Sequence, residues 1–156
     1  SLILLICLSP VFALVALANI IDDGFPIFFK QKRVGQNNAH FWIYKFRTMK
    51  KNTPDIPTHL VKNGKSLYTA IGPFLRKYSI DELPQLINIV KGDMTFIGPR
   101  PALYNQDDLI ELRTQAGVDR LIPGVTGWAQ VNGRDELSIP DKVKMDEYYL
   151  KNQSFW

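Results

Sequence analysis

The sequence predicts a mostly helical protein with one short β-hairpin and a membrane-embedded N-terminal helix. Three observations lead to this fold: an uncharged apolar segment at residues 2–21, two short aromatic-rich segments around a glycine-containing turn, and four helical patterns in the remainder. The chain has 156 residues, of which 46% are hydrophobic and 22% charged. That composition supports one folded core and excludes an intrinsically disordered chain.

The apolar segment at residues 2–21 has the length of a membrane helix. Its only polar side chains are Ser9 and Asn19, and a helix of about 20 residues is roughly 30 Å long, which matches a bilayer core. A cleaved signal peptide is disfavoured because Asn19-Ile20-Ile21 lacks the small residues of a cleavage site. The segment is therefore expected to stay in the protein as a membrane helix.

Pro10 predicts a bend in this helix. A proline at that position removes the hydrogen bond to the carbonyl of Ile6, and the hydroxyl of Ser9 can bond a carbonyl left without its donor. Two arrangements fit: a kinked helix that spans the membrane, and a re-entrant helix whose ends lie on the same side. We favour the re-entrant helix because the break lies at mid-depth.

The segment after the membrane helix is basic and predicts a hairpin. Residues 25–29 and 40–46 have the composition of two strands around a turn at residues 35–38. Seven cations lie in or near this hairpin, and by the positive-inside bias they place it in the cytoplasm, although a solvated basic loop has the same composition. They are Lys30, Lys32, Arg33, Lys45, Arg47, Lys50 and Lys51.

A nucleic-acid-binding function is disfavoured by the pattern of the second strand. Lys45 and Arg47 alternate with Tyr44 and Phe46, so the cations and the aromatic rings lie on opposite faces. A basic strand that stacks bases needs both on the same face. The single cysteine, Cys7, excludes an intrachain disulfide and a cysteine-rich zinc site.

The rest of the chain predicts helices and turns. Residues 52–66 are rich in Asn, Thr, Pro, Lys and Gly and predict a surface loop. Helical patterns follow at about residues 68–78, 82–91, 105–117 and 139–151. Residues 98–101 and 123–127 have turn chemistry.

Two adjacent acids, Asp81 and Glu82, stand where a helix is expected to begin. Ser79 and Glu82 fit a capping box, but that register puts Pro84 at a helical position whose amide should already be bonded. With Asp81 as the N-cap, the proline falls at the third position, where a missing donor costs nothing. Acids at a helix start serve as caps or, near cations, as functional carboxylates.

Cations around these acids favour phosphate chemistry. Arg76, Lys77, Lys91 and Arg100 lie within about 20 positions of the pair, and Asp93 adds another acid. A carboxylate attacks phosphorus or holds Mg²⁺ only when the charge of the phosphate is neutralised, and arginine does so with two parallel donors. Each of these cations alone is equally consistent with a solvated helix end.

Four sequence blocks together resemble one family. They are residues 45–49 (KFRTM), 81–86 (DELPQL), 92–101 (GDMTFIGPRP) and 123–134 (PGVTGWAQVNGR). In this order they are similar to the bacterial sugar transferase family, the monotopic polyprenyl-phosphate phosphoglycosyl transferases. The resemblance runs from about Ser9 to the last residue.

The resemblance implies a fold, a location and a domain organisation. The implied fold is α+β, a small, mostly helical membrane-associated domain with a short β-hairpin and a proline-kinked re-entrant helix. Residues 1–21 would form the membrane helix, and residues 22–156 the cytoplasmic catalytic domain. The implied location is the bacterial inner membrane, with the catalytic domain on its cytoplasmic face.

The resemblance also implies a reaction. Asp81 would attack the β-phosphate of a UDP-sugar and release UMP, and polyprenyl (undecaprenyl) phosphate would then take the sugar phosphate from the aspartate. This is the first membrane step of exopolysaccharide or other glycoconjugate synthesis, lipopolysaccharide O-antigen included. The implied cofactor is Mg²⁺, bound by Asp81 and Glu82, and the implied substrate-binding residues are Lys45, Arg76, Arg100, Arg134 and Asp146.

Two alternatives to this enzyme stay open at the level of sequence. One is a membrane-anchored module that binds anionic lipid through the basic region around Lys45 without catalysis. The other is a metal-dependent hydrolase that splits the nucleotide sugar with water. The first predicts that Asp81→Asn is tolerated, and the second that free sugar phosphate is released without polyprenyl phosphate.

Overall fold

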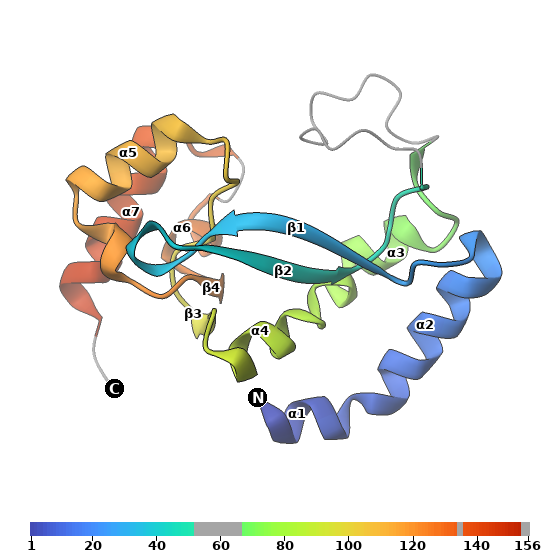
Figure 1. The fold of residues 1–156 in the computed structure, drawn as a ribbon. Helices are drawn as coiled ribbons and strands as arrows, with labels where there is room; N and C mark the ends of the chain where they lie inside the picture. Colours follow the sequence, from blue (N-terminus) through green and yellow to red (C-terminus); the bar gives the residue numbers. More distant parts are fainter. Residues whose placement is uncertain (52–66, 134–135, 154–156) are drawn as a thin grey trace. The chain divides into compact units, whose positions relative to one another are not determined.

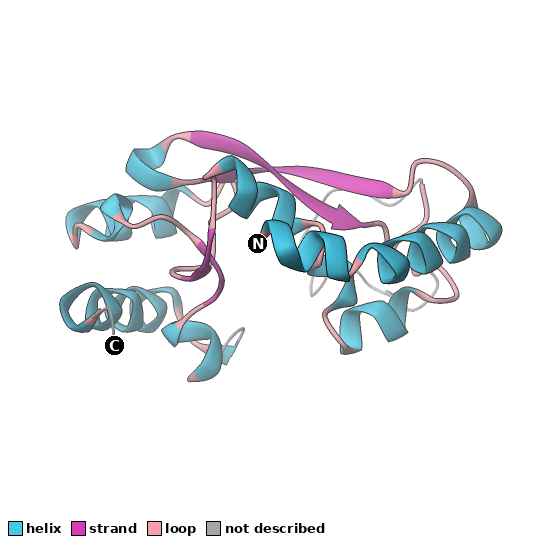
Figure 2. Ribbon diagram, turned by 90° about the horizontal axis from the view of Figure 1, so that it is seen from below, coloured by secondary structure: helices cyan, strands magenta, loops and turns pink. Residues whose placement is uncertain are grey.

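The computed structural model describes residues 1–51, 67–133 and 136–153, and confirms a chain of the α+β class. The helices are α1 (Leu2–Cys7), α2 (Ser9–Asp23), α3 (Gly72–Lys77), α4 (Gln85–Lys91), α5 (Asp107–Gln115), α6 (Trp128–Val131) and α7 (Ile139–Asn152). The strands are β1 (Phe28–Val34), β2 (His40–Phe46), β3 (Thr95–Ile97) and β4 (Gly124–Thr126), and short 3-10 helices occur at η1 (Gln36–Asn38), η4 (Ile80–Glu82) and η5 (Val118–Arg120). Strands β1 and β2 pair as the hairpin, β3 pairs with β4, and most of the remaining described chain is helix and loop (Figures 1 and 2). The loop predicted at residues 52–66 lies outside the described residues.

The chain divides into two compact units. The first comprises Ser1–Lys30 and Tyr44–Ile87, and the second comprises Gln31–Ile43 and Asn88–Trp156. The hairpin and α4 therefore each contribute residues to both units.

The predicted bend in the N-terminal helix is confirmed. The helix breaks at Leu8, whose φ of −90° and ψ of 0° separate α1 from α2, and the chain changes direction there (Figure 1). The hydroxyl of Ser9 donates a 2.8 Å hydrogen bond to the carbonyl oxygen of Ile6, the carbonyl that Pro10 leaves without its usual donor. In the part of the chain that the structure describes, no helix has both the length and the apolar composition needed to cross a membrane.

The first unit packs α2 and α3 around the end of the hairpin. Phe46 is 1% exposed and forms a core with Val15 of α2 and Leu75 of α3. The ring centroid of Phe46 lies 5.2 Å from that of Phe12 and 5.4 Å from that of Phe28. These contacts hold β2, and with it Lys45, in a fixed position in the unit.

The second unit is built on helices α5 and α7 and a pair of short parallel strands. Helix α5 packs against α7 (Figure 1). The core of this unit consists of Val34, Ala102, Leu109 and Val143. Thr95 of β3 is paired with Gly124 of β4, and Ile97 with Thr126. Residues 123–127, which contain β4, were predicted as a turn, and no strand was predicted at residues 95–97; the turn predicted at residues 98–101 directly follows β3.

The first strand was predicted at residues 25–29 and instead runs from Phe28 to Val34. The cations in this stretch hid the strand, yet in the structure they contact partners in the hairpin and beyond it. The ammonium group of Lys30 lies 5.4 Å from the centre of the Tyr44 ring, and the Arg33 guanidinium donates to the carbonyl of Pro101 at 3.0 Å. A strand tolerates such long cations because their apolar stems cover its surface while the charged ends find other groups.

Three of the predicted helices are shorter in the structure. Residues 68–71 precede α3 and are not helical. Tyr68 forms an isolated antiparallel β-bridge with Met49, and the amide of Thr69 donates to the carbonyl of Thr48 at 3.1 Å. Backbone groups that pair in this extended way cannot also make helical hydrogen bonds. Helix α4 begins only after Pro84. The expected helix at residues 105–117 is trimmed at both ends to α5, whereas α7 matches its prediction to one residue.

Candidate active site

Asp81 and Glu82 lie in the one-turn 3-10 helix η4 and not at the start of α4. Ser79 precedes this turn with a left-handed backbone (φ 55°) and makes no side-chain capping bond. Both predicted registers, the capping box and Asp81 as the N-cap, are therefore wrong. The reason is Pro84: the chain satisfies its amides with i−3 bonds, such as Leu83 N–H to Ile80 O at 3.2 Å, and starts the α-helix only after the proline.

The structure brings Lys45 and Arg76 to the two acids. Lys45 of β2 forms an ion pair with Glu82, with 2.8 Å between Nζ and Oε1 and side chains 15% and 11% exposed. Both Lys45 and Arg76 act electrostatically on Asp81. The four residues all belong to the first unit, so this part of the predicted site forms one cluster.

Asp81 itself is buried, with 7% of its surface exposed. Burial raises the pKa of its carboxyl above the ordinary value of 3.8, the charge of Lys45 lowers it, the charge of Glu82 raises it and that of Arg76 lowers it. The net direction is upward. A carboxylate that burial has stripped of its hydrating water is a stronger nucleophile toward an electrophilic atom such as phosphorus. Added positive charge at the site would keep this carboxylate ionised.

Arg76 is held by a residue that the sequence analysis did not identify. The side chain of Arg76 donates a 2.9 Å hydrogen bond to the Tyr68 hydroxyl, and its guanidinium carbon lies 5.3 Å from the centre of the Tyr68 ring. Tyr68 lies eight positions before Arg76, in a segment predicted as helix. A helix would not have paired these two side chains, so the wrong element prediction concealed the contact.

Arg47, the neighbour of Lys45 in the KFRTM block, has a structural role in the same unit. Its side chain is 7% exposed and donates to the carbonyls of Asp23 at 3.0 Å and Gly24 at 2.6 Å, with the Asp23 carboxylate 3.1 Å away. Arg47 therefore binds the C-terminal end of α2, where carbonyls lack intrahelical donors and the helix dipole attracts cations.

The remaining predicted site residues belong to the second unit or are not described. Arg100 lies between the buried Pro99 and Pro101 in the turn that follows β3. Asp146 of α7 is 1% exposed, and Arg134 lies outside the described residues. The predicted binding of substrate by these three residues stays a prediction.

The carboxyl of Asp146 is engaged by Arg113. Nε and one terminal nitrogen of Arg113 donate to the same carboxylate oxygen of Asp146, at 3.0 and 2.6 Å. Burial raises the pKa of Asp146, while the charge and hydrogen bonds of Arg113 lower it, and the net direction is upward. The other terminal nitrogen of Arg113 donates to the backbone carbonyl of Arg100 at 2.8 Å.

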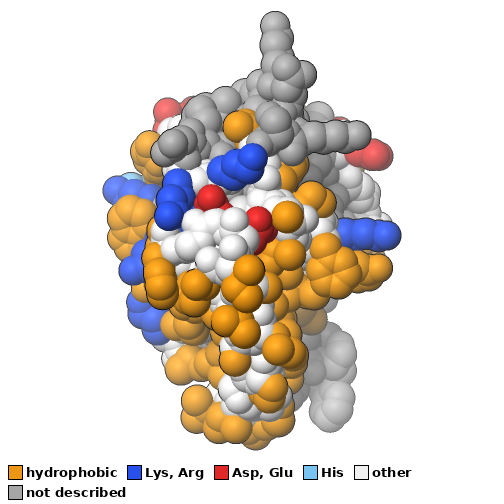
Figure 3. Space-filling model, turned by 90° about the vertical axis from the view of Figure 1, so that its right-hand side faces the viewer, with side chains coloured by type: hydrophobic (Ala, Val, Ile, Leu, Met, Phe, Trp, Pro, Cys, Tyr) orange, Lys and Arg blue, Asp and Glu red, His pale blue; other side chains and the backbone are white. Residues whose placement is uncertain are grey.

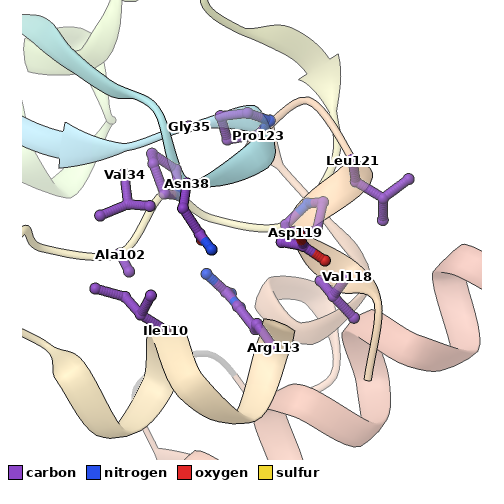
Figure 4. A pocket seen from close by; sticks show the side chains of 12 residues that line it. Val34, Gly35, Asn38, Ala102, Ile110, Arg113, Val118, Asp119, Leu121 and Pro123 are labelled. Carbon is purple, nitrogen blue, oxygen red and sulfur yellow. The ribbon is translucent and has the colours of Figure 1, made fainter. Parts of the chain in front are cut away.

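A small cavity lies beside this network in the second unit. Figure 4 shows Arg113 and Asn38 facing each other across it, with Asp119 and Val118 on one side. Its volume is about 30 Å³, which is enough for water but far too small for a nucleotide sugar. This cavity is not a substrate pocket.

The carboxylates at Asp81 and Glu82 suit a magnesium ion that also binds substrate. Among the described residues, no group of three or more His, Cys, Asp and Glu side chains is placed to hold a metal. Mg²⁺ commonly takes only one or two carboxylates and completes its shell with water and substrate phosphates. Two adjacent carboxylates, Asp81 and Glu82, fit that mode of binding.

Comparisons with known proteins agree on one family. A family model described as "Bacterial sugar transferase" matches residues 1–156. The chain is 43% identical to the "Uncharacterized sugar transferase EpsL" of Bacillus subtilis, over 99% of this chain and 75% of that protein. It is 38% identical to the "Undecaprenyl-phosphate glucose phosphotransferase" of Komagataeibacter xylinus, over 100% of this chain and 31% of that protein. It is 35% identical to the "UDP-glucose:undecaprenyl-phosphate glucose-1-phosphate transferase" of Escherichia coli, over 99% of this chain and 35% of that protein.

Proposed function

Because the chain belongs to the bacterial sugar transferase family and is thereby an enzyme of the phosphoglycosyl transferase class, we propose that it transfers a sugar 1-phosphate from a UDP-sugar to undecaprenyl phosphate through an aspartyl intermediate on Asp81. The products are UMP and undecaprenyl-diphosphate-sugar, which starts the assembly of an exopolysaccharide or another glycoconjugate. The names of relatives that act on undecaprenyl phosphate support the acceptor. The assignment of Asp81 as the nucleophile is supported by one observation: its carboxyl is buried beside Lys45, Arg76 and Glu82.

The reaction has two displacements at the same phosphorus. In the first, a carboxylate oxygen of Asp81 forms a bond to the β-phosphorus, the bond from that phosphorus to the bridging oxygen breaks, and UMP leaves with the bond's electron pair. In the second, a phosphate oxygen of undecaprenyl phosphate forms a bond to the phosphorus, and Asp81 leaves as a carboxylate. The enzyme thus never needs to hold both anionic substrates at once, which avoids their mutual repulsion.

Lys45, Arg76 and Glu82 prepare the nucleophile for this chemistry. The positive charges of Lys45 and Arg76 lower the pKa of Asp81 against the effect of burial, and so favour its ionised, attacking form. The ion pair between Lys45 and Glu82 fixes the ammonium group in the cluster. Mg²⁺ held by Asp81 and Glu82 together with the substrate phosphates would supply further neutralisation of phosphate charge.

Arg100 and Arg134 are proposed to bind the donor. An arginine presents two parallel donors to a phosphate, and the backbone of the Pro99–Arg100–Pro101 turn is restricted because both prolines have a fixed φ. A restricted turn fixes the backbone from which the Arg100 side chain extends, so less backbone freedom is lost when the donor binds. The reaction at Asp81 does not depend on donor binding by these two residues.

The N-terminal helices are proposed to hold the enzyme in the inner membrane, with the catalytic domain, residues 22–156, on the cytoplasmic face. Large hydrophobic side chains of α1 and α2 are exposed, and hydrophobic side chains gather on the face shown in Figure 3. Those of the two helices are Leu2, Ile3, Leu4, Ile6, Leu14, Leu17 and Ile21. On the other side of α2, Val15 and Asn19 are buried within the unit. We propose that residues 1–21 enter and leave the membrane on the same side, because the helix breaks at Leu8.

The proposed function is tested by incubating membranes that contain the protein with a panel of UDP-sugars, with and without undecaprenyl phosphate and Mg²⁺. The expected result is continuous UMP release only when acceptor and metal are both present. Continuous release of free sugar phosphate without acceptor would indicate a hydrolase instead. Absence of UMP from every UDP-sugar under all of these conditions would refute the proposal. An Asp81→Asn variant that keeps the biological function of the wild type would favour a lipid-binding module without catalysis.

A further inference from the structure

We infer that Arg113 and Asp146 are positioning residues that fix the backbone of Arg100, so that Asp146 acts through Arg113 and does not itself bind substrate. The inference rests on the proposed function only for the role of Arg100 toward the donor. The contacts that carry it all lie within the second unit.

The turn that carries Arg100 has few ways to be held. Pro99 and Pro101 have no N–H group, so the segment must be fixed mainly through its carbonyl oxygens. Each carbonyl from residue 99 to residue 102 accepts a hydrogen bond from elsewhere in the unit. The donors are the Gly124 amide to Pro99 at 2.9 Å, Arg113 to Arg100 at 2.8 Å, Arg33 to Pro101 at 3.0 Å and the Val34 amide to Ala102 at 3.0 Å.

Among these four bonds, the one from Arg113 is the bond to the carbonyl of Arg100 itself. Two of the other donors are the backbone amides of Gly124 and Val34, which no side-chain change other than proline removes, and Arg33 donates to the next residue, Pro101. Arg113 reaches this carbonyl with one terminal nitrogen while its other terminal nitrogen and Nε bind Asp146. A planar guanidinium with these three donors committed cannot rotate without losing all of them.

Asp146 is placed to orient Arg113 and not to contact a ligand. Its side chain is 2% exposed, and that of Arg113 is 12% exposed. A substrate phosphate would also be repelled by a carboxylate, whereas an arginine without its carboxylate would be a buried, unpaired charge. The buried pair therefore sets the position of the Arg100 carbonyl, and with it the origin of the Arg100 side chain.

The test combines hydrogen exchange with a kinetic double-mutant comparison on the intact membrane protein. Arg113→Lys keeps the charge next to Asp146 but cannot bind both the carboxylate and the Arg100 carbonyl. We expect faster amide exchange across residues 98–103 and a donor KM raised on the order of tenfold, with kcat changed less. Arg120→Lys, the same substitution on an exposed residue of the same unit, is the control and should change neither.

The decisive comparison is made in an Arg100→Ala background. If Arg113 acts through Arg100, adding Arg113→Lys to Arg100→Ala should not raise the donor KM further. If Arg113 has only a structural role, the fold-increases in donor KM of the two single variants should multiply in the double variant. Asp146→Asn should reproduce the Arg113→Lys pattern, and the lysine variant keeps the test valid if the asparagine variant does not fold. Unchanged exchange across residues 98–103, or multiplicative effects on KM, would overturn the inference. A wild type that releases no UMP would refute the proposed function and leave the exchange measurement to decide this inference separately.

Discussion

The proposed reactivity of Asp81 as a nucleophile depends on a balance between burial, which raises its pKa, and the charge of Lys45, which is the strongest effect lowering it. Lys45→Met keeps most of the side-chain volume and removes the charge. We therefore expect the pKa of Asp81 to rise further, so that the acid limb of the kcat/KM profile for the donor moves to higher pH. The measurement is the rate of the first half-reaction, UMP release, as a function of pH.

Lys30→Met is the matched control for this prediction, because Lys30 belongs to the same hairpin and is not among the groups that shift the pKa of Asp81. It should leave the acid limb in place. An acid limb that does not move in Lys45→Met, or that moves equally in both variants, would mean that Lys45 does not act on the nucleophile.

The raised pKa of Asp81 also predicts a cost in stability. A folded-state pKa above the unfolded value means that the folded protein binds the proton more tightly, so stability falls as pH rises from the unfolded pKa through the folded one. Asp81→Asn removes this cost while keeping the shape of the side chain. We expect its melting temperature to equal or exceed that of the wild type at pH 7, with the difference disappearing below pH 3.8, the ordinary value. A variant clearly less stable than the wild type at pH 7 would contradict this assignment of the pKa.

At the scale of residues, the sequence was sufficient where the chemistry is local and insufficient where it depends on tertiary contacts. The acids, and the cations that meet them at Lys45 and Arg76, were identified from their types and their place in the sequence blocks. Tyr68 and Arg113 were missed because each acquires its role through tertiary contacts: Arg113 is 33 positions from Asp146 and 13 from Arg100. Nothing in the sequence around Arg113 distinguishes it from an ordinary helix-surface arginine.

At the scale of elements, the break near Pro10 was predictable and the pairing of β3 with β4 was not. Proline chemistry acts within one helical turn, so the Ser9 bond to Ile6 follows from three neighbouring positions. Each of the parallel strands has only three residues, and Thr95 pairs with Gly124 across a long connection. Segments of three residues are too short to show the alternation of apolar and polar side chains that marks a strand. At residues 123–127 the glycines and the proline therefore predicted a turn.

The β3–β4 pairing requires glycine at position 124. A Cβ atom there would collide with the backbone nitrogen of Gly98, which is itself held by a 2.8 Å hydrogen bond to Thr126 and cannot move aside. We expect Gly124→Ala to destabilise the protein by about 2 kcal/mol or more, which lowers the melting temperature by about 5 °C. Thermal unfolding followed by circular dichroism measures this.

Gly35→Ala provides the comparison for Gly124→Ala. The Cβ added at position 35 would meet mainly the Phe41 side chain, at 3.1 Å, and a side chain can shift where a backbone cannot. Its loss of stability should be clearly smaller. Equal losses in the two variants would show that close backbone approach is not what position 124 requires.

At the scale of the whole molecule, the proposed position of the N-terminal helices in the membrane would decide how a lipid-borne phosphate meets a water-soluble nucleotide. A re-entrant arrangement keeps both ends of residues 1–21 on the cytoplasmic side. Single cysteines at Ser1 and at the exposed Phe25, with Cys7 replaced by alanine, report on both ends. In intact spheroplasts an impermeant maleimide should label neither site, and after lysis it should label both.

Labelling of the site at position 1 alone in intact spheroplasts would contradict the re-entrant arrangement and indicate a spanning one. Activity of both cysteine variants, measured as UMP release, is the control that they are folded. The reaction at Asp81 would survive such a result, because a spanning helix can also hold the catalytic residues at the cytoplasmic interface.

The central claim is that Asp81 carries the sugar phosphate covalently between the two substrates. The direct measurement is the intact mass of the purified protein after incubation with Mg²⁺ and a UDP-sugar that supports turnover, without acceptor. We predict one added sugar phosphate on the wild type, mapped by proteolysis to the peptide with Asp81, removed by adding undecaprenyl phosphate, and missing in Asp81→Asn. An Asp81→Asn variant that still forms the adduct, or a wild type that turns over UDP-sugar with acceptor yet never forms it, would contradict the claim.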